Sequence, residues 1–246
     1  MATFVLVQGA FVGGWCWRWV APELRAAGHE VVAPTLTGLG ERVHLASPQI
    51  DLDTHIEDVV NVLHYEDLTG VVLLGWSYGG MVVAGVADRA PERIAHVVYL
   101  DSDVPRDGET SVPPSSHAAR EELARAHGDG WRVPPAVTRV ETVLLAELPE
   151  DRRRWIVPRL VPHLLKTWTQ PIQLSGNAAM IPTTYIRCTV GYDPDDEDTQ
   201  RQDQRIRSEP GWRYRELAES HAAPLTAPRA VANLLLEAVQ HPPPRS

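Results

Sequence analysis

The feature that most constrains this chain is a serine held between glycines, where an apolar strand pattern meets a helix pattern. The segment reads Gly75-Trp76-Ser77-Tyr78-Gly79-Gly80 and follows the apolar run 71–74. A serine at such a turn is held in a strained backbone conformation with its hydroxyl clear of the sheet. With this glycine and serine content, chance gives roughly 0.05 matches to the pattern. The segment therefore predicts Ser77 as a nucleophile.

Strand and helix patterns alternate along most of the sequence. Short apolar runs predict strands at 4–7, 31–33, 71–74 and 96–100, with further strands at 184–189 and 212–217. Helix patterns cover about 17–27, 53–65, 78–90 and 228–239. Asp53 is the expected N-cap of the second helix. This alternation predicts an α/β fold with a mostly parallel, doubly wound sheet of about six strands.

The pattern changes between residues 104 and 181, where prolines recur and the helical segments are short and amphipathic. We expect this insert after the fourth strand to fold as a helical cap, or lid. Residues 1–103 and 182–241 then form the core, and the proline-rich residues 242–246 form a loose tail. A length of 246 residues fits one such domain.

Charge and cysteine content exclude several classes of protein. The net charge of −9 argues against nucleic acid as a partner, because phosphate binding needs clustered basic residues. No run approaches the roughly 18 apolar residues of a membrane span. Cys16 and Cys188 are too few for a disulfide framework and lack metal-ligand spacing. We expect a cytoplasmic protein that acts on a small molecule without metal or cofactor, and the oligomeric state stays open.

A serine nucleophile needs a base, and His221 is the best placed of the ten histidines. In folds that carry this serine turn, the base follows the last strand and precedes the last helix. His221 stands there, in the segment 219–224. The other histidines fall in predicted helices, in the insert, at a strand start, in an early loop or in the tail. The sequence therefore predicts His221 as the general base.

The acid that orients the histidine is ambiguous in the sequence. Asp101 ends the strand at 96–100, where catalytic groups gather in open α/β sheets. Asp193 follows the strand at 184–189, but it opens an acidic run, 193–198, that reads as a solvated loop. We favour Asp101, keep Asp193 as the alternative, and rank Asp103 third.

An oxyanion hole needs two backbone donors near the serine. The turn itself offers the Tyr78 N–H. The glycine-containing loop 8–15 follows the first strand and offers the Ala10 N–H, with Phe11 as the next candidate.

Four segments, 4–10, 13–17, 24–29 and 75–81, resemble the α/β-hydrolase superfamily. The closest branch holds small-molecule methylesterases and hydroxynitrile lyases. The resemblance implies an α/β-hydrolase fold, with Ser77 as nucleophile, His221 as base, and Ala10 and Tyr78 as oxyanion donors.

Three positions depart from that branch. Gln8 and Trp76 stand where it usually has histidine, and Gly191 stands where its acid normally falls. Cofactor-free ring-cleaving dioxygenases of the same fold resemble the alternative layout, with an acid that matches Asp101.

Three functions remain open at this point. We favour a serine hydrolase that cleaves a small apolar or aromatic ester or lactone through an acyl-enzyme, with Trp131, Trp155 and Trp168 as candidate pocket residues. The alternative is a non-hydrolytic enzyme, such as a lyase, a cyclase or a cofactor-free oxygenase, that uses the His–Asp pair as base. The third is a binding protein without catalysis, which has no need of both Ser77 and His221.

Overall fold

The computed structural model describes residues 1–135, 148–191 and 197–240. Its centre is a six-stranded sheet in the order β2-β1-β3-β4-β7-β8, and every neighbouring pair is parallel. The strands are β1 (Thr3–Val7), β2 (Glu30–Val32), β3 (Val71–Trp76), β4 (Ile94–Leu100), β7 (Thr183–Cys188) and β8 (Trp212–Leu217). The predicted parallel sheet of about six strands is confirmed.

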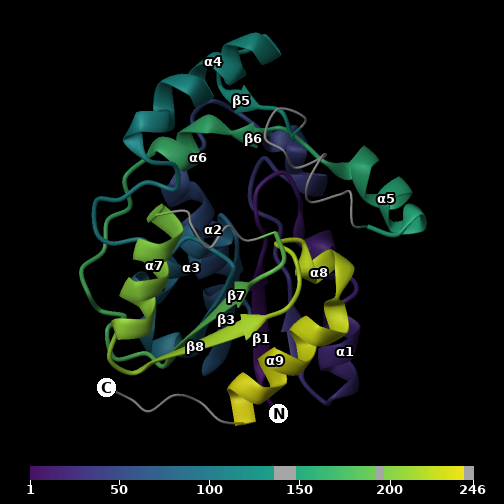
Figure 1. Cartoon of the computed structure of the whole chain (residues 1–246), viewed down its shortest axis with the longest axis vertical. Coiled ribbons are helices and arrows are strands. Elements are labelled where there is room, and N and C mark those ends of the chain that lie inside the picture. The colour runs from purple at the N-terminus through teal and green to yellow at the C-terminus, as the bar shows by residue number, and fades with distance from the viewer. Residues whose placement is uncertain (136–147, 192–196, 241–246) are drawn as a thin grey trace.

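Helices cover both faces of the sheet (Figure 1). Their bounds are α1 (Ala21–Ala26), α2 (Leu52–Tyr65), α3 (Gly79–Arg89), α7 (Glu197–Ser208), α8 (Ala223–Thr226) and α9 (Pro228–Gln240). Short 3₁₀ helices lie at η1 (Gly14–Trp17), η2 (Gly40–Leu45) and η3 (Pro91–Arg93). None of the helices in the described ranges is long and apolar enough to cross a membrane.

Alternating side chains of the strands point to opposite faces of the sheet and pack into two separate hydrophobic cores. Val5 and Val7 of β1 pack in the core that includes α2 and α3, whereas Phe4 and Leu6 pack in the core that includes α1 and α9. Such strands are apolar at every position because each face of the sheet is covered. This explains why the strands read as continuous apolar runs in the sequence.

Residues 104–181, which we name the lid segment, contribute no strand to the six-stranded sheet in their described part. They form η4 (Pro114–Ser116), α4 (His117–His127), β5 (Arg132–Val133), α5 (Glu150–Ile156), η7 (Val157–Arg159), β6 (His163–Leu164) and α6 (Leu165–Thr169). β5 and β6 pair antiparallel, a small sheet that the sequence did not predict. Figure 1 shows these elements grouped at one end of the main sheet. That the segment acts as a lid remains a prediction.

Two helix starts differ from the sequence-based expectation. The helix predicted for 17–27 is divided into η1 and α1, because Pro22 sits in the first turn of α1, where proline starts a helix. Asp51, rather than Asp53, caps α2. Its carboxylate accepts the Thr54 N–H at 3.1 Å, and the Thr54 hydroxyl oxygen accepts the Asp51 N–H. This reciprocal pair outcompetes Asp53, which lies inside the first turn.

The chain leaving β4 lies against the first turn of α3. A Cβ atom on Gly80 would lie 2.0 Å from the Asp103 carbonyl oxygen and 2.8 Å from the Ser102 hydroxyl. The Asp103 N–H also donates to the Ser77 carbonyl at 3.3 Å. Glycine at position 80 thus lets the segment after β4 rest on the helix that follows the serine.

Gly80→Ala tests this contact. Helix propensity alone predicts a gain of up to about 1 kcal/mol in the free energy of unfolding. The backbone contact predicts instead a loss of about 2 kcal/mol or more, because a carbonyl oxygen has no rotamer by which to move away. Urea unfolding of both proteins measures the sign, and a stabilised variant would contradict the close approach.

Candidate active site

Ser77 occupies a strained turn between β3 and α3. Its φ is +56°, a left-handed conformation that costs a non-glycine residue free energy. A Cβ on Gly75 would lie 2.5 Å from the Gly79 carbonyl oxygen, and one on Gly79 would lie 2.7 Å from the Gln8 carbonyl oxygen. Both positions therefore require glycine for strand, helix and the loop after β1 to meet. The turn predicted from the sequence is the one the chain adopts.

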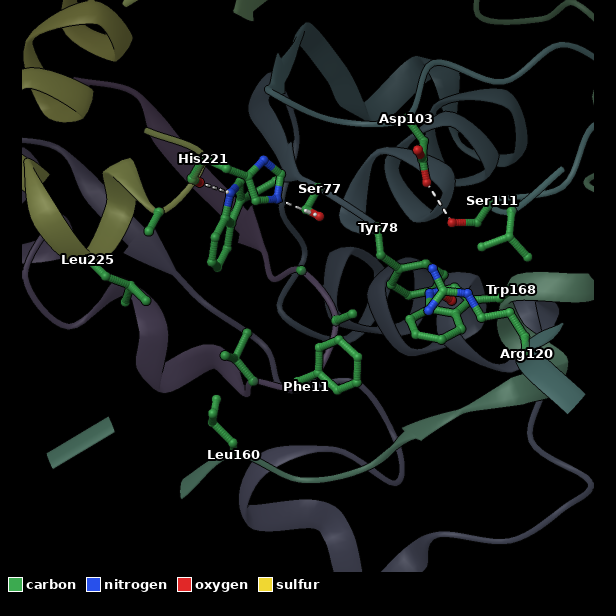
Figure 2. Close-up of a pocket in the computed structure, with 16 residues that line it drawn as sticks. Phe11, Ser77, Tyr78, Asp103, Ser111, Arg120, Leu160, Trp168, His221 and Leu225 are labelled. Carbon is green, nitrogen blue, oxygen red and sulfur yellow. Dashed lines mark hydrogen bonds between the residues drawn. The ribbon is translucent and has the colours of Figure 1, made fainter. Parts of the chain in front are cut away.

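The structure brings Ser77, His221 and Asp101 together from three distant parts of the chain. The Ser77 hydroxyl lies 2.9 Å from His221 Nε2, and His221 Nδ1 lies 2.6 Å from Asp101 Oδ2. Each residue follows the carboxyl end of a strand: β3, β8 and β4. Figure 2 shows the Ser77–His221 contact inside the pocket. With Asp101 accepting the Nδ1 proton, Nε2 is left to accept from the serine hydroxyl.

Of the other two candidate acids, the structure describes Asp103 alone. Asp193 lies outside the described residues. Asp103 makes no hydrogen bond to His221 in the described part of the chain, and its Oδ2 instead accepts the Ser111 hydroxyl at 2.6 Å.

The Asp101 carboxylate has further donors on its other oxygen. Arg187 Nη1 lies 3.1 Å and the Cys188 N–H lies 3.2 Å from Oδ1. Burial raises the pKa of Asp101, but its hydrogen bond to His221 and the charges of His221 and Arg187 outweigh burial, so this pKa lies below its usual value. The carboxylate is thus held ionised and oriented.

Arg187 is itself anchored by a second carboxylate. Its Nε and Nη2 lie 3.0 and 2.5 Å from Asp203 Oδ1, and the Tyr214 hydroxyl donates to Asp203 Oδ2 at 3.0 Å. The side chains of Arg187, Asp101 and Asp203 are only 10%, 11% and 12% exposed. Arg187 was not predicted from the sequence, although a charged residue inside the predicted strand 184–189 was a signal.

Gln8 and Trp76, two of the three departures from the methylesterase branch, hold the loops of the site. The Trp76 indole N–H donates to the His221 carbonyl at 2.8 Å, which fixes the backbone of the histidine. The buried Gln8 amide N–H donates to the Val12 carbonyl at 2.9 Å, which fixes the loop after β1. Both side chains thus bind backbone rather than the reacting groups.

The two residues expected as oxyanion donors line the same pocket as Ser77. Ala10 and Tyr78 both line the pocket that contains Ser77. In the described ranges, neither backbone N–H donates to another group of the protein. Such donors are available to an oxygen of a bound ligand.

The Tyr78 side chain forms a rigid wall of the pocket. Its hydroxyl donates to His55 Nδ1 at 2.8 Å, and His55 Nε2 donates to the Thr37 carbonyl at 2.9 Å. Burial lowers the pKa of His55 to about 4, so the imidazole is neutral near pH 7. The ring of Tyr78 also meets His163 edge-on, with ring centroids 4.7 Å apart.

The pocket has a volume of about 260 Å³ and opens onto Ser77 and His221. Its walls are mainly apolar, with a polar group of three side chains, Asp103, Ser111 and Arg120. Of the tryptophans expected to line it, only Trp168 does. Trp155 packs instead against Trp15 and Trp19, with ring centroids 5.3 and 5.4 Å apart, and the Arg132 guanidinium covers Trp131. Helical periodicity cannot show which face of a short lid helix turns inward.

Comparison with known proteins identifies the family. The profile of the alpha/beta hydrolase family matches residues 4–234. The chain belongs to the α/β-hydrolase family. The α/β-hydrolase fold and the resemblance stated from the sequence are thereby confirmed.

Relatives of this α/β-hydrolase include named esterases. A carbendazim hydrolyzing esterase of Nocardioides sp. (strain SG-4G) is 39% identical over 201 residues, 79% of this chain and 82% of that protein. Methylesterase 8 of Arabidopsis thaliana is 34% identical over 103 residues, 42% of this chain and 38% of that protein. Among solved structures, an extracellular α/β-hydrolase from a Paenibacillus species has a TM-score of 0.81 at 24% identity, covering 97% of this chain and 99% of that one.

Arg187→Met tests the charge cluster behind His221. Removing the cation leaves the carboxylates of Asp101 and Asp203 buried without it, which typically costs about 3–5 kcal/mol of stability. We expect that loss in urea unfolding at pH 7.5. The loss should shrink near pH 5, because Asp101 without Arg187 binds a proton at a higher pH than in the wild type, and a protonated carboxyl needs no cation.

Arg154→Met is the matched control. Arg154 pairs with Glu150 at 2.9 Å, but the two side chains are 78% and 67% exposed. Exposed pairs contribute about 1 kcal/mol or less. Equal losses in the two variants would contradict the assignment of a buried, stabilising role to Arg187.

Proposed function

We propose that this α/β-hydrolase is a serine esterase that cleaves a small apolar or aromatic carboxylic ester or lactone through an acyl-enzyme. The observation that carries the proposal is the chain of hydrogen bonds from Ser77 through His221 to Asp101, at 2.9 and 2.6 Å, beside a pocket of about 260 Å³. The names of the Nocardioides and Arabidopsis relatives support ester hydrolysis.

In the proposed reaction, the Ser77 hydroxyl oxygen attacks the ester carbonyl while His221 Nε2 takes its proton. Asp101 holds the imidazole in the tautomer that accepts this proton and stabilises the imidazolium that forms. The Ala10 and Tyr78 N–H groups stabilise the developing oxyanion. His221 then protonates the leaving alcohol. In the second half of the reaction, His221 takes a proton from water while the water attacks the acyl-enzyme, and the acid is released as Ser77 regains its proton.

A non-hydrolytic role for the His–Asp pair is the weaker candidate. In that role His221 acts on the substrate directly, and a serine hydroxyl 2.9 Å from Nε2 competes for the same nitrogen. The named relatives also favour hydrolysis. A pure binding role leaves the Ser77–His221–Asp101 contacts without a purpose.

A labelling and turnover experiment tests the proposal. We expect a fluorophosphonate probe to label the wild type on Ser77, and the wild type to release nitrophenol from p-nitrophenyl acetate and butyrate. Ser77→Ala should do neither, because the nucleophile is gone. A wild type that is folded but fails both assays would refute the esterase.

The acid is tested by comparing Asp101→Asn with Asp193→Asn. Loss of the orienting carboxylate leaves the imidazole in the wrong tautomer, so we expect Asp101→Asn to lower kcat by roughly 10⁴-fold. Asp193→Asn should stay within a few-fold of the wild type. Steady-state kinetics on p-nitrophenyl acetate measure both, and the reverse order of effects would transfer the role to Asp193.

A further inference from the structure

Arg120 is a cation on the wall of the pocket that contains Ser77, and the proposed mechanism does not use it. It lies in α4 of the lid segment, lines the pocket and is partly buried. Figure 2 shows its guanidinium extending from the lid segment toward the centre of the pocket. A charged group in a mainly apolar cavity loses hydration, and a partner of opposite charge or hydrogen bonds have to offset that loss.

The protein supplies no anionic partner for this guanidinium. Within residues 1–135, 148–191 and 197–240, no oxygen accepts a hydrogen bond from it and no carboxylate forms an ion pair with it. The next two residues of α4, Glu121 and Glu122, are exposed, and Glu121 pairs with Arg125 at 3.8 Å. Residues one or two positions apart on a helix do not face each other. Burial, with no anion to oppose it, lowers the pKa of Arg120 below its usual value.

The contacts that Arg120 does make leave its N–H donors unused. Its Cζ lies over the Trp168 ring, 5.1 Å from the centroid. Such a cation–π contact uses the plane of the guanidinium rather than the N–H groups at its edge. His163 stacks on the same tryptophan, with ring centroids 4.5 Å apart, and burial, His55 and the charge of Arg120 hold the pKa of His163 well below its usual value. These aromatic neighbours position the cation without neutralising it.

Asp103 lines the same pocket but does not pair with Arg120. Its Oδ2 accepts the Ser111 hydroxyl at 2.6 Å. Burial raises the pKa of Asp103 to about 6, and the influences that oppose this rise come from Ser111 and His221 rather than from Arg120. The described wall of the pocket thus holds a carboxylate and a guanidinium that do not neutralise each other.

The position of Arg120 relative to His221 shows which part of an ester can reach it. In Figure 2, His221 and Leu225 lie on one side of Ser77, whereas Arg120 and Trp168 lie on the other. In the proposed reaction the leaving oxygen lies beside His221, because Nε2 protonates it. A group that binds Arg120 therefore belongs to the end of the substrate remote from the leaving oxygen, which is the acyl part.

We propose that Arg120 is a specificity-determining residue, whose guanidinium binds a carboxylate at the far end of the acyl part of the substrate. This inference rests on the proposed esterase activity and adds a substrate class to it, the monoesters of dicarboxylic acids with an apolar spacer. The forked N–H donors of a guanidinium match the two oxygens of a carboxylate. The chain carries a net charge of −9, so an anionic substrate needs a local cation to bind.

The test uses two methyl esters that differ in charge at the end of the acyl chain. Monomethyl adipate ends in a carboxylate, whereas methyl 6-methylheptanoate ends in an isopropyl group of similar size and branching. The same methylene chain separates either group from the ester, so the two carbonyls have similar intrinsic reactivity. We would measure kcat/KM for each ester by methanol release at pH 7.5.

Arg120→Met should lower the adipate-to-heptanoate ratio of kcat/KM by roughly 10- to 100-fold, the usual value of a hydrogen bond between charged groups. Both esters are measured on the same preparation, so any loss of folded protein cancels in the ratio. Arg120→Lys keeps the charge but not the fork, and should lower the ratio less. Arg125→Met is the matched control: Arg125 lies on the same helix and is 65% exposed, so this variant should keep the wild-type ratio.

A third ester decides between the two charges of the pocket. Methyl 6-aminohexanoate carries an ammonium group at the end of its acyl chain, which suits Asp103 rather than Arg120. We expect the wild type to cleave it less efficiently than monomethyl adipate. Asp103→Asn should raise the adipate-to-heptanoate ratio, because it removes a charge that repels the carboxylate.

The outcomes separate this inference from the proposed function. An unchanged ratio in Arg120→Met would overturn the inference alone, as would a wild type that prefers the ammonium ester or that cleaves p-nitrophenyl butyrate but not monomethyl adipate. Fluorophosphonate labelling at the wild-type rate shows that a variant keeps Ser77 and His221 intact. A folded wild type that neither labels nor cleaves any of these esters would instead overturn the esterase itself.

Discussion

The site depends on one backbone constraint, the left-handed turn at Ser77. A non-glycine residue in this conformation costs about 1–3 kcal/mol and persists only where its surroundings hold it. Here β3 lies in the middle of the sheet, and the Ser77 N–H donates to the Leu100 carbonyl at 3.3 Å. The Ser77 carbonyl in turn accepts the N–H groups of Gly80 and Asp103, at 2.9 and 3.3 Å. The hydrogen bonds that hold the strained serine thus also position the segment after β4 beside the pocket.

Charge is the second constraint, and it follows from the position of the Asp101 carboxylate. Asp101 directly follows β4, and the neighbouring strand β7 supplies groups that face its carboxylate. The Cys188 N–H and the Arg187 guanidinium of β7 do so, and Asp203 from α7 holds the guanidinium. A buried arginine between two carboxylates is expensive to desolvate but orients both. In this arrangement the pairing of β4 with β7, rather than a loop, sets the position of the Asp101 carboxylate.

The sequence predicted what depends on local patterning. Apolar runs located the strands, and the glycine pattern located the turn at Ser77, because both follow from backbone geometry. Ser77, His221 and Asp101 were predicted from their places after strands. Arg187 and Ser111 were not, since their partners lie 86 and 8 residues away in the chain and only the fold brings them into contact. The prediction that three tryptophans of the lid segment line the pocket was wrong for two of them, for a related reason. The hydrophobic pattern indicates burial, but not which cavity or partner a ring faces.

Asp101 and Asp103 show how far environment separates two identical side chains two residues apart. Asp101 faces back into the sheet, where Arg187, Cys188 and His221 surround it, and its pKa lies below the usual range. Asp103 faces the pocket with Ser111 as its hydrogen-bond donor, and burial raises its pKa to about 6. Carboxyl groups whose environments shift their pKa values in opposite directions usually do different work in one site. One carboxylate is completed by the protein and suits a fixed structural charge beside His221. The other lies on the wall of the pocket that contains Ser77, with the Ser111 hydroxyl as its hydrogen-bond donor among the described residues.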